Sequence, residues 1–315
     1  MSEKQRVLIT GGTGYIGGRL SKHLVDCGWT VRVGSRKTRA QVLDLFGPVV
    51  EYASYDASNS RISLESLLRD CDSVIHLAGM NAASCEEKSK EAIEVNVKAT
   101  ERLLEASHTH SIRRFIYVST IHVFGSPLIG NLAEDKKPNP SHPYGKTKAA
   151  AELITATADS HSMSTIIVRL SNGFGPPLSI LSSCWELVVN DLCRQAITKR
   201  RLILYSSGKQ LRDFVPLSAV TRGIEQLLII TPRATGNIFH LGNGLPISVK
   251  EMAKLIARRC ESLFGYKPPL NCGNTPKASP NFEFATKGIL ETGHEPQINI
   301  EDEIDETLRF CKKYL

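Results

Sequence analysis

The residues of this sequence best suited to chemistry are a tyrosine and a lysine four positions apart, Tyr144 and Lys148. Pro143, directly before the tyrosine, suits the first turn of a helix, and a helix beginning there would place both side chains on one face. A free phenol has a pKa of about 10, which a nearby ammonium lowers by stabilising the phenolate. The pair therefore predicts a proton-transfer site. The alternative is an ordinary tyrosine and lysine on an exposed helix face.

Two hydroxyl residues, Ser119 and Thr120, lie upstream at the end of an apolar run. The carboxyl ends of parallel strands are where an open α/β sheet collects its ligands. A hydroxyl there can hold a substrate oxygen while Tyr144 moves its proton, with the adjacent carbon facing a nicotinamide ring. Thr120, Tyr144 and Lys148 are thus the predicted catalytic residues of a hydride-transfer site. His122, two positions after Thr120, is a candidate for facing the substrate.

A glycine-rich stretch at residues 10–17 lies between an apolar run at 6–9 and a segment with apolar residues at helical spacing. Glycines let a backbone approach a pyrophosphate closely, and the helix that follows offers free N–H groups and partial positive charge. We therefore predict dinucleotide binding here, with a tight structural turn as the alternative. The predicted binding residues of this turn are Gly11, Thr13, Gly14, Tyr15, Ile16 and Gly17.

The residues after the second predicted strand bear on the choice of cofactor. A fold that selects NAD places an Asp or Glu there, on the adenosine ribose. This chain has Ser35, Arg36 and Lys37 instead. One hydroxyl and two cations suit a 2′-phosphate, so the sequence favours NADP over NAD.

Strand and helix signals alternate through the first 170 residues, which is typical of a parallel sheet with helices on both faces. Apolar runs predict strands at 6–9, 30–33, 49–52, 73–77, 114–119 and 165–170. Helical patterns lie at 64–70, 88–107 and 147–159, and later at 184–198 and 249–259. Two strand-like pieces follow at 202–205 and 237–241, and residues 271–296 are rich in Pro, Gly and Asn, which indicates loops.

We therefore predict an α/β protein with a Rossmann-type, doubly wound parallel sheet and a smaller C-terminal α/β domain for the substrate. The predicted NADP-binding domain comprises residues 1–172 and roughly 210–243, and the predicted substrate domain 173–209 and 244–315.

The composition limits the classes of partner. The net charge of +7 is spread over separate basic clusters without a nucleic-acid-binding motif, so we expect an anionic small molecule rather than nucleic acid, with a solvated basic surface as the alternative. No apolar run reaches the roughly 18 to 20 residues of a membrane helix, and no room is left for a signal peptide. Eight cysteines without a CxxC pair indicate reduced thiols and no zinc site. A cytoplasmic enzyme without a membrane partner is expected.

Taken in chain order, these motifs resemble those of the extended short-chain dehydrogenase/reductases. The motifs are 10–17, 76–79, 96–100, 117–125 and 143–148, and those at 169–176 and 212–215 are similar to the nucleotide-sugar epimerase/dehydratase branch. The resemblance implies the catalytic trio above, and it implies that Asp56 lies near the adenine, for which a turn is the alternative. Further implied cofactor contacts are Leu77, Ala78, Gly79, Asn96 and Ser119, besides Tyr144 and Lys148 themselves. Asn172 and Arg212 are the implied contacts to a nucleotide diphosphate.

One departure from the family narrows the reaction. Sugar-nucleotide dehydratases carry an Asp-Glu pair after the catalytic threonine, whereas this chain has Ile121 and His122. We expect a 4-keto-reductase or a C4 epimerase of a nucleotide-diphosphate sugar, with a slight preference for the reductase. The alternatives are a reductase of a small ketone, for which Arg212 has no purpose, and a non-catalytic NADP-sensing regulator.

The resemblance also suggests a homodimer, in which the helices at 88–107 and 147–159 pair with their symmetry mates as a four-helix bundle. These helices carry more apolar residues than one buried stripe requires. The residues are Ala92, Ile93, Leu103, Leu104, Ala149, Ala150, Leu153 and Ile154. The alternative is that all of them face their own sheet.

Overall fold

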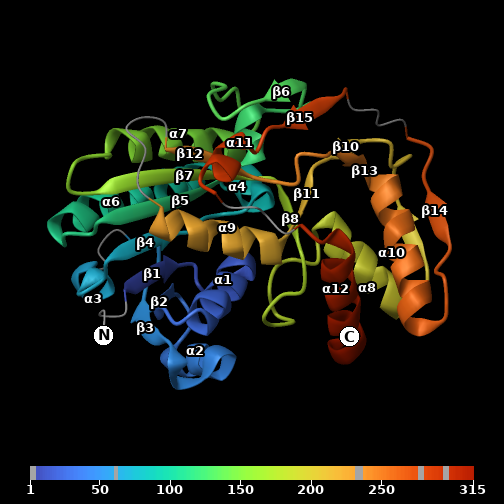
Figure 1. The fold of residues 1–315 in the computed structure, drawn as a ribbon, viewed down its shortest axis with the longest axis horizontal. Helices are drawn as coiled ribbons and strands as arrows, with labels where there is room; N and C mark the ends of the chain where they lie inside the picture. Colours follow the sequence, from blue (N-terminus) through green and yellow to red (C-terminus); the bar gives the residue numbers. More distant parts are fainter. Residues whose placement is uncertain (1–4, 60–62, 231–236, 276–279, 294–297) are drawn as a thin grey trace. The chain divides into compact units, whose positions relative to one another are not determined.

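The structure is a computed structural model that describes residues 5–59, 63–230, 237–275, 280–293 and 298–315. Its main feature is a seven-stranded sheet in the order β12-β7-β5-β4-β1-β2-β3 (Figure 1). The strands are β1 Arg6–Thr10, β2 Thr30–Ser35, β3 Glu51–Ser54, β4 Ser73–His76, β5 Arg114–Thr120, β7 Ser164–Leu170 and β12 Ile238–Leu241. The pairs β3–β2, β2–β1, β1–β4, β4–β5 and β5–β7 are all parallel, so the predicted doubly wound α/β fold is confirmed.

The order of the strands reverses beside β1, whose neighbours are β2 and β4. In an open α/β sheet this switch point is where ligands bind, at the carboxyl ends of the strands. Side chains of β1 alternate between the two faces because successive residues of a strand point to opposite sides. Leu8 packs into the cluster formed with Phe115, Tyr117 and the helices of one face, and Val7 and Ile9 are buried as well.

Helices connect these strands. They are α1 Tyr15–Asp26, α2 Arg39–Phe46, α3 Glu65–Leu68, α4 Ala82–Glu87, α5 Ser89–Ile93, α6 Ala99–Thr109, α7 Pro143–Thr157 and α9 Leu217–Ile229. The predicted single helix at 88–107 is divided, because a π-helical segment, Glu94–Lys98, separates α5 from α6. In the described part of the chain, no helix is long and apolar enough to cross a membrane.

The chain forms two compact units. The first comprises residues 1–126, 134–170 and 221–239, and the second 127–133, 171–220 and 240–315. These compact units differ from the predicted domains at residues 127–133, 171–172, 210–220 and 240–243, which lie in the second unit. A short apolar segment at 127–133 gives no composition shift that would mark it as part of another unit.

The second unit has its own core, in which Phe174, Phe214, Met252 and Leu308 are buried. Its helices are α8 Val188–Thr198, α10 Val249–Phe264, α11 Lys287–Glu291 and α12 Ile300–Tyr314. Its strands form two-stranded pairs: β6 Gly130–Leu132 with β15 Phe282–Phe284, β8 Asn172–Phe174 with β11 Phe214–Pro216, β9 Leu202–Leu204 with β14 Leu270–Cys272, and β10 Leu211–Arg212 with β13 Ile247–Ser248. The predicted loops at 271–296 contain β15 and α11, and residues 276–279 and 294–296 of that range lie outside the described residues.

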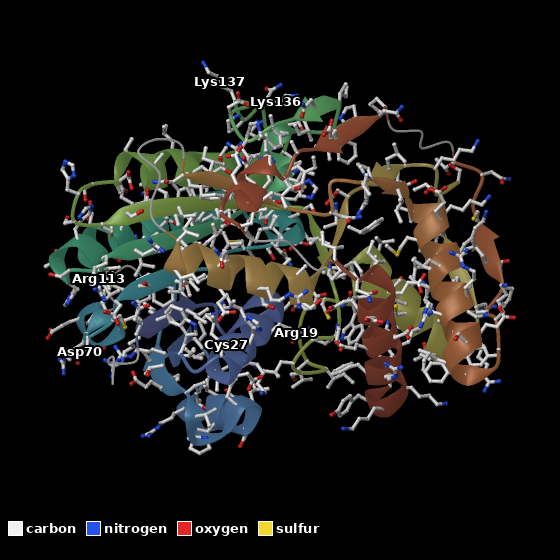
Figure 2. All side chains as sticks on the ribbon, in the orientation of Figure 1. Arg19, Cys27, Asp70, Arg113, Lys136 and Lys137 are labelled. Atoms are coloured by element: carbon white, nitrogen blue, oxygen red, sulfur yellow. The ribbon has the colours of Figure 1, made fainter. Side chains whose placement is uncertain are left out.

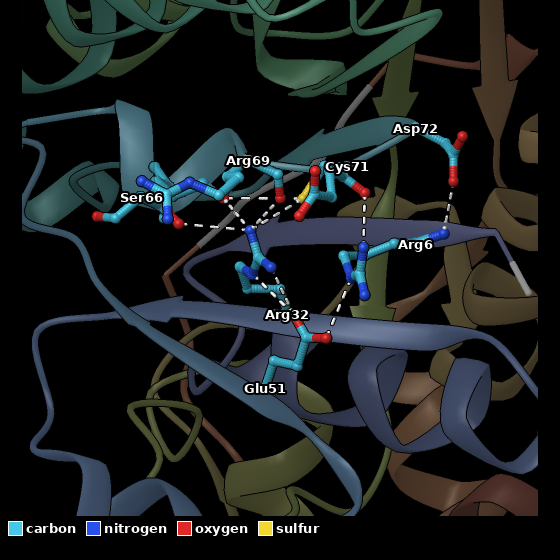
Figure 3. Close-up of polar contacts among 9 residues, drawn as sticks. Arg6, Arg32, Glu51, Ser66, Arg69, Cys71 and Asp72 are labelled. Atoms are coloured by element: carbon cyan, nitrogen blue, oxygen red, sulfur yellow. Dashed lines mark hydrogen bonds and ion pairs between the residues drawn. The ribbon is translucent and has the colours of Figure 1, made fainter.

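An arginine–glutamate network joins the first three strands at the edge of the first unit (Figure 3). Glu51 on β3 accepts from Arg32 on β2 at 2.6 Å and from Arg6 on β1 at 3.0 Å. Arg32 also donates to the carbonyl oxygens of Leu67 and Arg69, at 3.1 and 2.6 Å, so it holds the end of α3 against the sheet. The network is structural, because its donors are used by carboxylate and carbonyl oxygens of the protein itself.

Candidate active site

The predicted proton donor, Tyr144, lies in the first turn of α7, beside the carboxyl end of β5. His142 caps this helix, since its Nδ1 accepts from the backbone N–H of Gly145 at 3.3 Å, and Pro143 follows at the first helical position. Thr120 ends β5 and is buried. Burial raises the pKa of the Tyr144 phenol to about 12, and a side-chain hydrogen bond with Thr120 partly opposes this rise. The structure therefore brings Thr120 and Tyr144 together, with the phenol protonated at neutral pH.

Lys148 follows Tyr144 by one helical turn and is buried. Its Nζ donates to the carbonyl oxygen of Val118 at 2.7 Å and lies 4.4 Å from the centroid of the Tyr117 ring. Burial lowers the pKa of Lys148 to about 8, against the opposing effect of the Glu152 carboxylate. The lysine is thus anchored on β5, and the carbonyl and the aromatic ring fix the position of its ammonium.

Glu152 and Arg169 form a buried ion pair beneath these residues, which no local sequence pattern predicted. Arg169 Nη2 on β7 lies 2.9 Å from Glu152 Oε2 on α7, and the two side chains are 2% and 6% exposed. The hydroxyl of Ser119 on β5 donates to Glu152 Oε1 at 2.5 Å. Ser119, a predicted cofactor contact, therefore uses its hydroxyl to hold α7 on the sheet. The spacing of Tyr144, Lys148 and Glu152, four residues each, was the available signal for a shared helix face.

Two imidazoles surround the Tyr144 ring. The ring of His122 is edge-on to it with centroids 6.2 Å apart, and the ring of His142 is parallel to it with centroids 6.3 Å apart. The two histidines contact each other at 5.4 Å between centroids. His122 lies two residues after Thr120, in the short 3-10 helix Ile121–Phe124. The backbone N–H of His122 donates to the Thr120 hydroxyl at 3.3 Å. The structure thus places the predicted substrate residue His122 at this site and adds His142.

The glycine-rich turn fits a dinucleotide phosphate. Gly11 has a φ of +68°, and a Cβ at Gly17 would lie 2.2 Å from the Gly11 carbonyl oxygen, so side chains at these positions are excluded. Gly14 is the N-cap of α1, is exposed, and provides no side-chain capping bond to the first turn. The N-terminal end of α1 therefore presents backbone N–H groups without a side-chain cap, which is the arrangement that an anion requires.

The loop after β4 packs closely on this turn. A Cβ at Gly11 would lie 2.9 Å from the N–H nitrogen of Ala78, and one at Gly79 would lie 2.9 Å from Asn96 Oδ1. Leu77 and Ala78 are half-buried, and Gly79 is exposed. Asn96, in the π-helical segment, accepts from the N–H of Met80 at 2.7 Å and donates to the Thr147 hydroxyl at 3.0 Å. The side chain of Asn96 is thus used to join this loop to α7.

The predicted cofactor-selecting residues follow β2. The hydroxyls of Ser35 and Thr13 are hydrogen-bonded at 2.7 Å, which links the end of β2 to the glycine-rich turn. The N–H of Lys37 donates to Ser35 Oγ at 3.1 Å. Arg36 is exposed and forms no ion pair with any described residue.

The remaining cofactor candidate, Asp56, follows β3. Its Oδ1 accepts from the N–H and the hydroxyl of Ser58, at 3.0 and 2.8 Å. Asp56 therefore forms the turn that the sequence offered as its alternative role.

The two predicted diphosphate contacts belong to the second unit. Asn172 begins β8, and its Nδ2 donates to the carbonyl oxygen of Asp213 at 2.8 Å. Arg212 is exposed on β10, whereas its neighbour Asp213 is fully buried and accepts from the N–H of Asn243 at 2.9 Å. Among the described residues Arg212 forms no ion pair, and Asp213 does not pair with it.

Comparison with known proteins shows which family has this arrangement of residues. The model of the NAD dependent epimerase/dehydratase family matches residues 7–240. The dTDP-glucose 4,6-dehydratase of Streptomyces niveus is 26% identical, over 98% of this chain and 93% of its own. The solved UDP-glucuronic acid 4-epimerase of Bacillus cereus, in complex with UDP-glucuronic acid and NAD, has a TM-score of 0.82 at 23% identity and covers 99% of this chain and 100% of its own.

A second solved structure, the UDP-glucose 4-epimerase of Thermotoga maritima with UDP-glucose, has a TM-score of 0.81 at 20% identity. It covers 98% of this chain and 99% of its own. These likenesses show the fold, and the family model covers the glycine-rich turn, Thr120, Tyr144 and Lys148 together. The chain therefore belongs to the NAD dependent epimerase/dehydratase family, the enzymes that form the nucleotide-sugar branch of the extended short-chain dehydrogenase/reductases.

Proposed function

We propose that this enzyme transfers a hydride at C4 of a nucleotide-diphosphate sugar, and that it acts in the direction of a 4-keto-reductase. The observation that carries the proposal is the protonated Tyr144 phenol, hydrogen-bonded to Thr120 at the carboxyl end of β5. A protonated phenol beside Thr120 can donate its proton to a carbonyl oxygen, which is the step that the reductive direction requires. A C4 epimerase is the second candidate, because the solved neighbours named above are epimerases.

In the proposed reduction, Thr120, Tyr144 and Lys148 have separate roles. Thr120 holds the substrate oxygen by a hydrogen bond, and Tyr144 donates its proton to that oxygen as the ketone becomes an alcohol. Lys148, held on the Val118 carbonyl, supplies positive charge on the same helix face and stabilises the phenolate that remains. The nicotinamide cofactor, when bound, supplies the hydride. Solvent then returns the proton to Tyr144.

NADPH is the form of the cofactor that the residues after β2 favour. Ser35 is buried with its hydroxyl bonded to Thr13 and to the N–H of Lys37, whereas Arg36 is exposed, so the guanidinium is the group available beside the place of the adenosine ribose. A guanidinium suits a phosphate and offers nothing specific to a ribose diol. The solved UDP-glucuronic acid 4-epimerase of Bacillus cereus holds NAD, so the choice of cofactor would distinguish this chain from that protein.

A dehydratase is not favoured, although relatives carry that name. Elimination of water needs an acid and a base beside the catalytic threonine. Ile121 is buried and apolar, and His122 packs on Tyr144 and His142. No carboxylate stands at either position.

The nucleotide diphosphate is assigned to the second unit. Arg212 is exposed there without an ion pair in the described chain, and a guanidinium binds two phosphate oxygens in a bidentate fork. We expect Arg212→Lys to raise the KM for the nucleotide sugar at least about tenfold, with NADPH affinity unchanged. Calorimetry with free UDP, GDP, CDP and dTDP on both proteins separates the substrate classes. If none binds the wild type at millimolar concentration, a reductase of small ketones takes first place.

The reaction is tested by incubating the protein with nucleotide sugars and their 4-keto forms while following NADPH absorbance. A reductase consumes one NADPH for each keto-sugar, whereas an epimerase interconverts two sugars without net change in the cofactor. Tight NADPH binding without turnover of any substrate would instead support the NADP-sensing regulator.

We also propose a homodimer through the face of α5 and α7. Ala92 on α5 and Leu103 and Leu104 on α6 are buried in their own core. Ile93 on α5 and Leu153 on α7 are instead 48% and 68% exposed. Ala150 is exposed beside Leu153. Of the apolar residues that the sequence offered for a dimer interface, the exposed ones are Ile93, Ala150 and Leu153, and we assign the interface to the patch that they form.

A further inference from the structure

Three side chains with metal-binding atoms converge at the end of α1 that is remote from the glycine-rich turn. His23 and Cys27 come from the last turn of α1 and its C-cap, and Glu225 comes from α9. His23 Nε2 lies 2.8 Å from Glu225 Oε2, and Cys27 Sγ lies 3.8 Å from His23 Nε2 and 3.5 Å from Glu225 Oε2. Cys27, which is labelled in Figure 2, is exposed, and the other two are half-buried.

These separations are close to those of a tetrahedral zinc site. With Zn–N and Zn–O bonds near 2.1 Å and a Zn–S bond near 2.3 Å, neighbouring ligand atoms lie about 3.4–3.6 Å apart. The two distances from the sulfur already match, and only the His23–Glu225 hydrogen bond has to open, by about half an ångström. A histidine and a cysteine four residues apart share one helix face, so their backbone is already in place.

The surroundings orient the ligands. Trp29 Nε1 donates to Glu225 Oε1 at 3.4 Å, which leaves Oε2 turned toward His23 and Cys27. The N–H of Cys27 donates to the carbonyl oxygen of His23 at 3.0 Å, which fixes the helix end. Such contacts behind the ligands set their orientation and tune affinity for the metal. Lys22, the nearby cation on α1, is paired with Asp26 and so does not compete for Glu225.

We propose that His23, Cys27 and Glu225 bind one Zn²⁺ ion, with water as the fourth ligand, and that the ion fastens the end of α1 to α9. A thiolate and a carboxylate balance the charge of the ion, and the mixed sulfur, nitrogen and oxygen set is one that zinc accepts. The thiol proton is released to solvent on binding. This proposal departs from the expectation of no zinc site, which rested on cysteine spacing alone, because the third ligand lies 198 residues from Cys27.

Two other roles for the cluster are less well supported. As a reactive thiol Cys27 would need a lowered pKa, but partial desolvation of the sulfur and the hydrogen bond to Glu225 raise its pKa to about 11. As a part of the hydride-transfer site the cluster would need to lie near Tyr144. Instead it lies at the opposite end of the 12-residue helix α1 from the glycine-rich turn, about 18 Å along the helix. The zinc ion would therefore stabilise the first unit and take no part in catalysis.

Tag-free protein stripped with a chelator and then titrated with Zn²⁺ against a chromophoric competitor tests the proposal. We expect one ion per chain with micromolar affinity or tighter. Cys27→Ser and His23→Gln should each weaken binding at least about tenfold, since each removes one of three ligands. Cys272→Ser and His161→Gln, which alter a thiol and an imidazole elsewhere, serve as matched controls and should bind as the wild type does.

Two further readouts identify the ligands. Co²⁺ in place of Zn²⁺ should show a thiolate-to-metal charge-transfer band that is absent in Cys27→Ser. Zinc should raise the melting temperature of the wild type and both controls but not of the ligand variants. Glu225→Gln, which keeps the shape of the side chain, covers the case in which another variant fails to fold. The proposal would be overturned if the wild type failed to bind zinc at micromolar concentration. It would also be overturned if Cys27→Ser and His23→Gln bound zinc as tightly as the wild type does.

Discussion

Glu152 and Arg169 join the helix that carries Tyr144 and Lys148 to the strand beside the reactive end of the sheet. The pair is buried, with 2.9 Å between Arg169 Nη2 and Glu152 Oε2, and Ser119 donates a further hydrogen bond to the same carboxylate. A buried ion pair contributes little net stability, but the removal of one partner leaves an uncompensated charge. The position of the catalytic helix face thus depends on a contact that touches neither the proposed substrate nor the proposed cofactor.

Glu152→Gln should destabilise the protein by about 3–5 kcal/mol, because it leaves the Arg169 guanidinium buried without a counter-charge. Urea unfolding at pH 7 measures this. Glu94→Gln is the matched control, since it removes an exposed pair with Lys98 and should cost about 0.5 kcal/mol or less. Equal losses in the two variants would show that the buried pair has no special weight.

Arg36→Ala should weaken NADPH by about tenfold to a hundredfold and leave NADH affinity nearly unchanged, because only NADPH carries the 2′-phosphate that the guanidinium would bind. Fluorescence titration of both cofactors provides the measurement. Arg39→Ala, an exposed arginine in the first turn of α2, is the control. Wild-type protein that binds NADH as tightly as NADPH would show that Ser35 and Arg36 do not select the cofactor.

The stability should depend on pH through Lys148. Burial lowers its pKa to about 8 from 10.5, so between pH 8 and 10 the unfolded state holds more protons than the folded state at this group. Stability therefore rises with pH in that window, by up to about 2 kcal/mol from Lys148 alone. The difference in unfolding free energy between wild type and Lys148→Met, measured across pH 8–10, isolates this contribution. If the difference in unfolding free energy between the two proteins did not change with pH, the pKa of Lys148 would not be lowered in the folded state.

Leu153→Glu should convert the dimer to a monomer, because it places a charge in the proposed apolar patch with Ile93 and Ala150. Light scattering at micromolar concentration should give twice the 34.7 kDa of one chain for the wild type and the single mass for the variant. Leu181→Glu, at another exposed leucine, is the control and should remain dimeric. A wild type of single mass at every concentration would end the dimer proposal.

The sequence predicted the sheet well, because buried parallel strands are continuous apolar runs and the glycine-rich turn has a pattern fixed by its backbone. Local patterns could not predict features that depend on distant partners. The amide of Asn96 joins Met80 and Thr147, which are distant in the sequence, and Glu152 is buried in α7 because Arg169 of β7 lies opposite it. Ser119 illustrates the same limit, since a hydroxyl at a strand end looks available until its partner on α7 is known.

The sequence predicted the reacting residues of the candidate site, but it did not predict all the side chains that surround them. Thr120 and Tyr144 come together as their motifs indicate, whereas His142 was missed because its value as a helix cap and ring neighbour depends on the turn before α7. The direct effect of Lys148 on the Tyr144 phenol remains a prediction, because in the structure the lysine is held by Val118 and burial dominates the pKa of the phenol.

Single-turnover oxidation of NADPH by a 4-keto nucleotide sugar, compared between wild type and Tyr144→Phe, tests the proposed hydride transfer most directly. The variant keeps the ring and loses only the proton donor, so we expect the rate to fall by about 10²–10⁴ while NADPH affinity stays within a few-fold. Tyr52→Phe on β3 is the control and should react at the wild-type rate. Retention of more than about a third of the wild-type rate by Tyr144→Phe would contradict the assignment of Tyr144 as the acid.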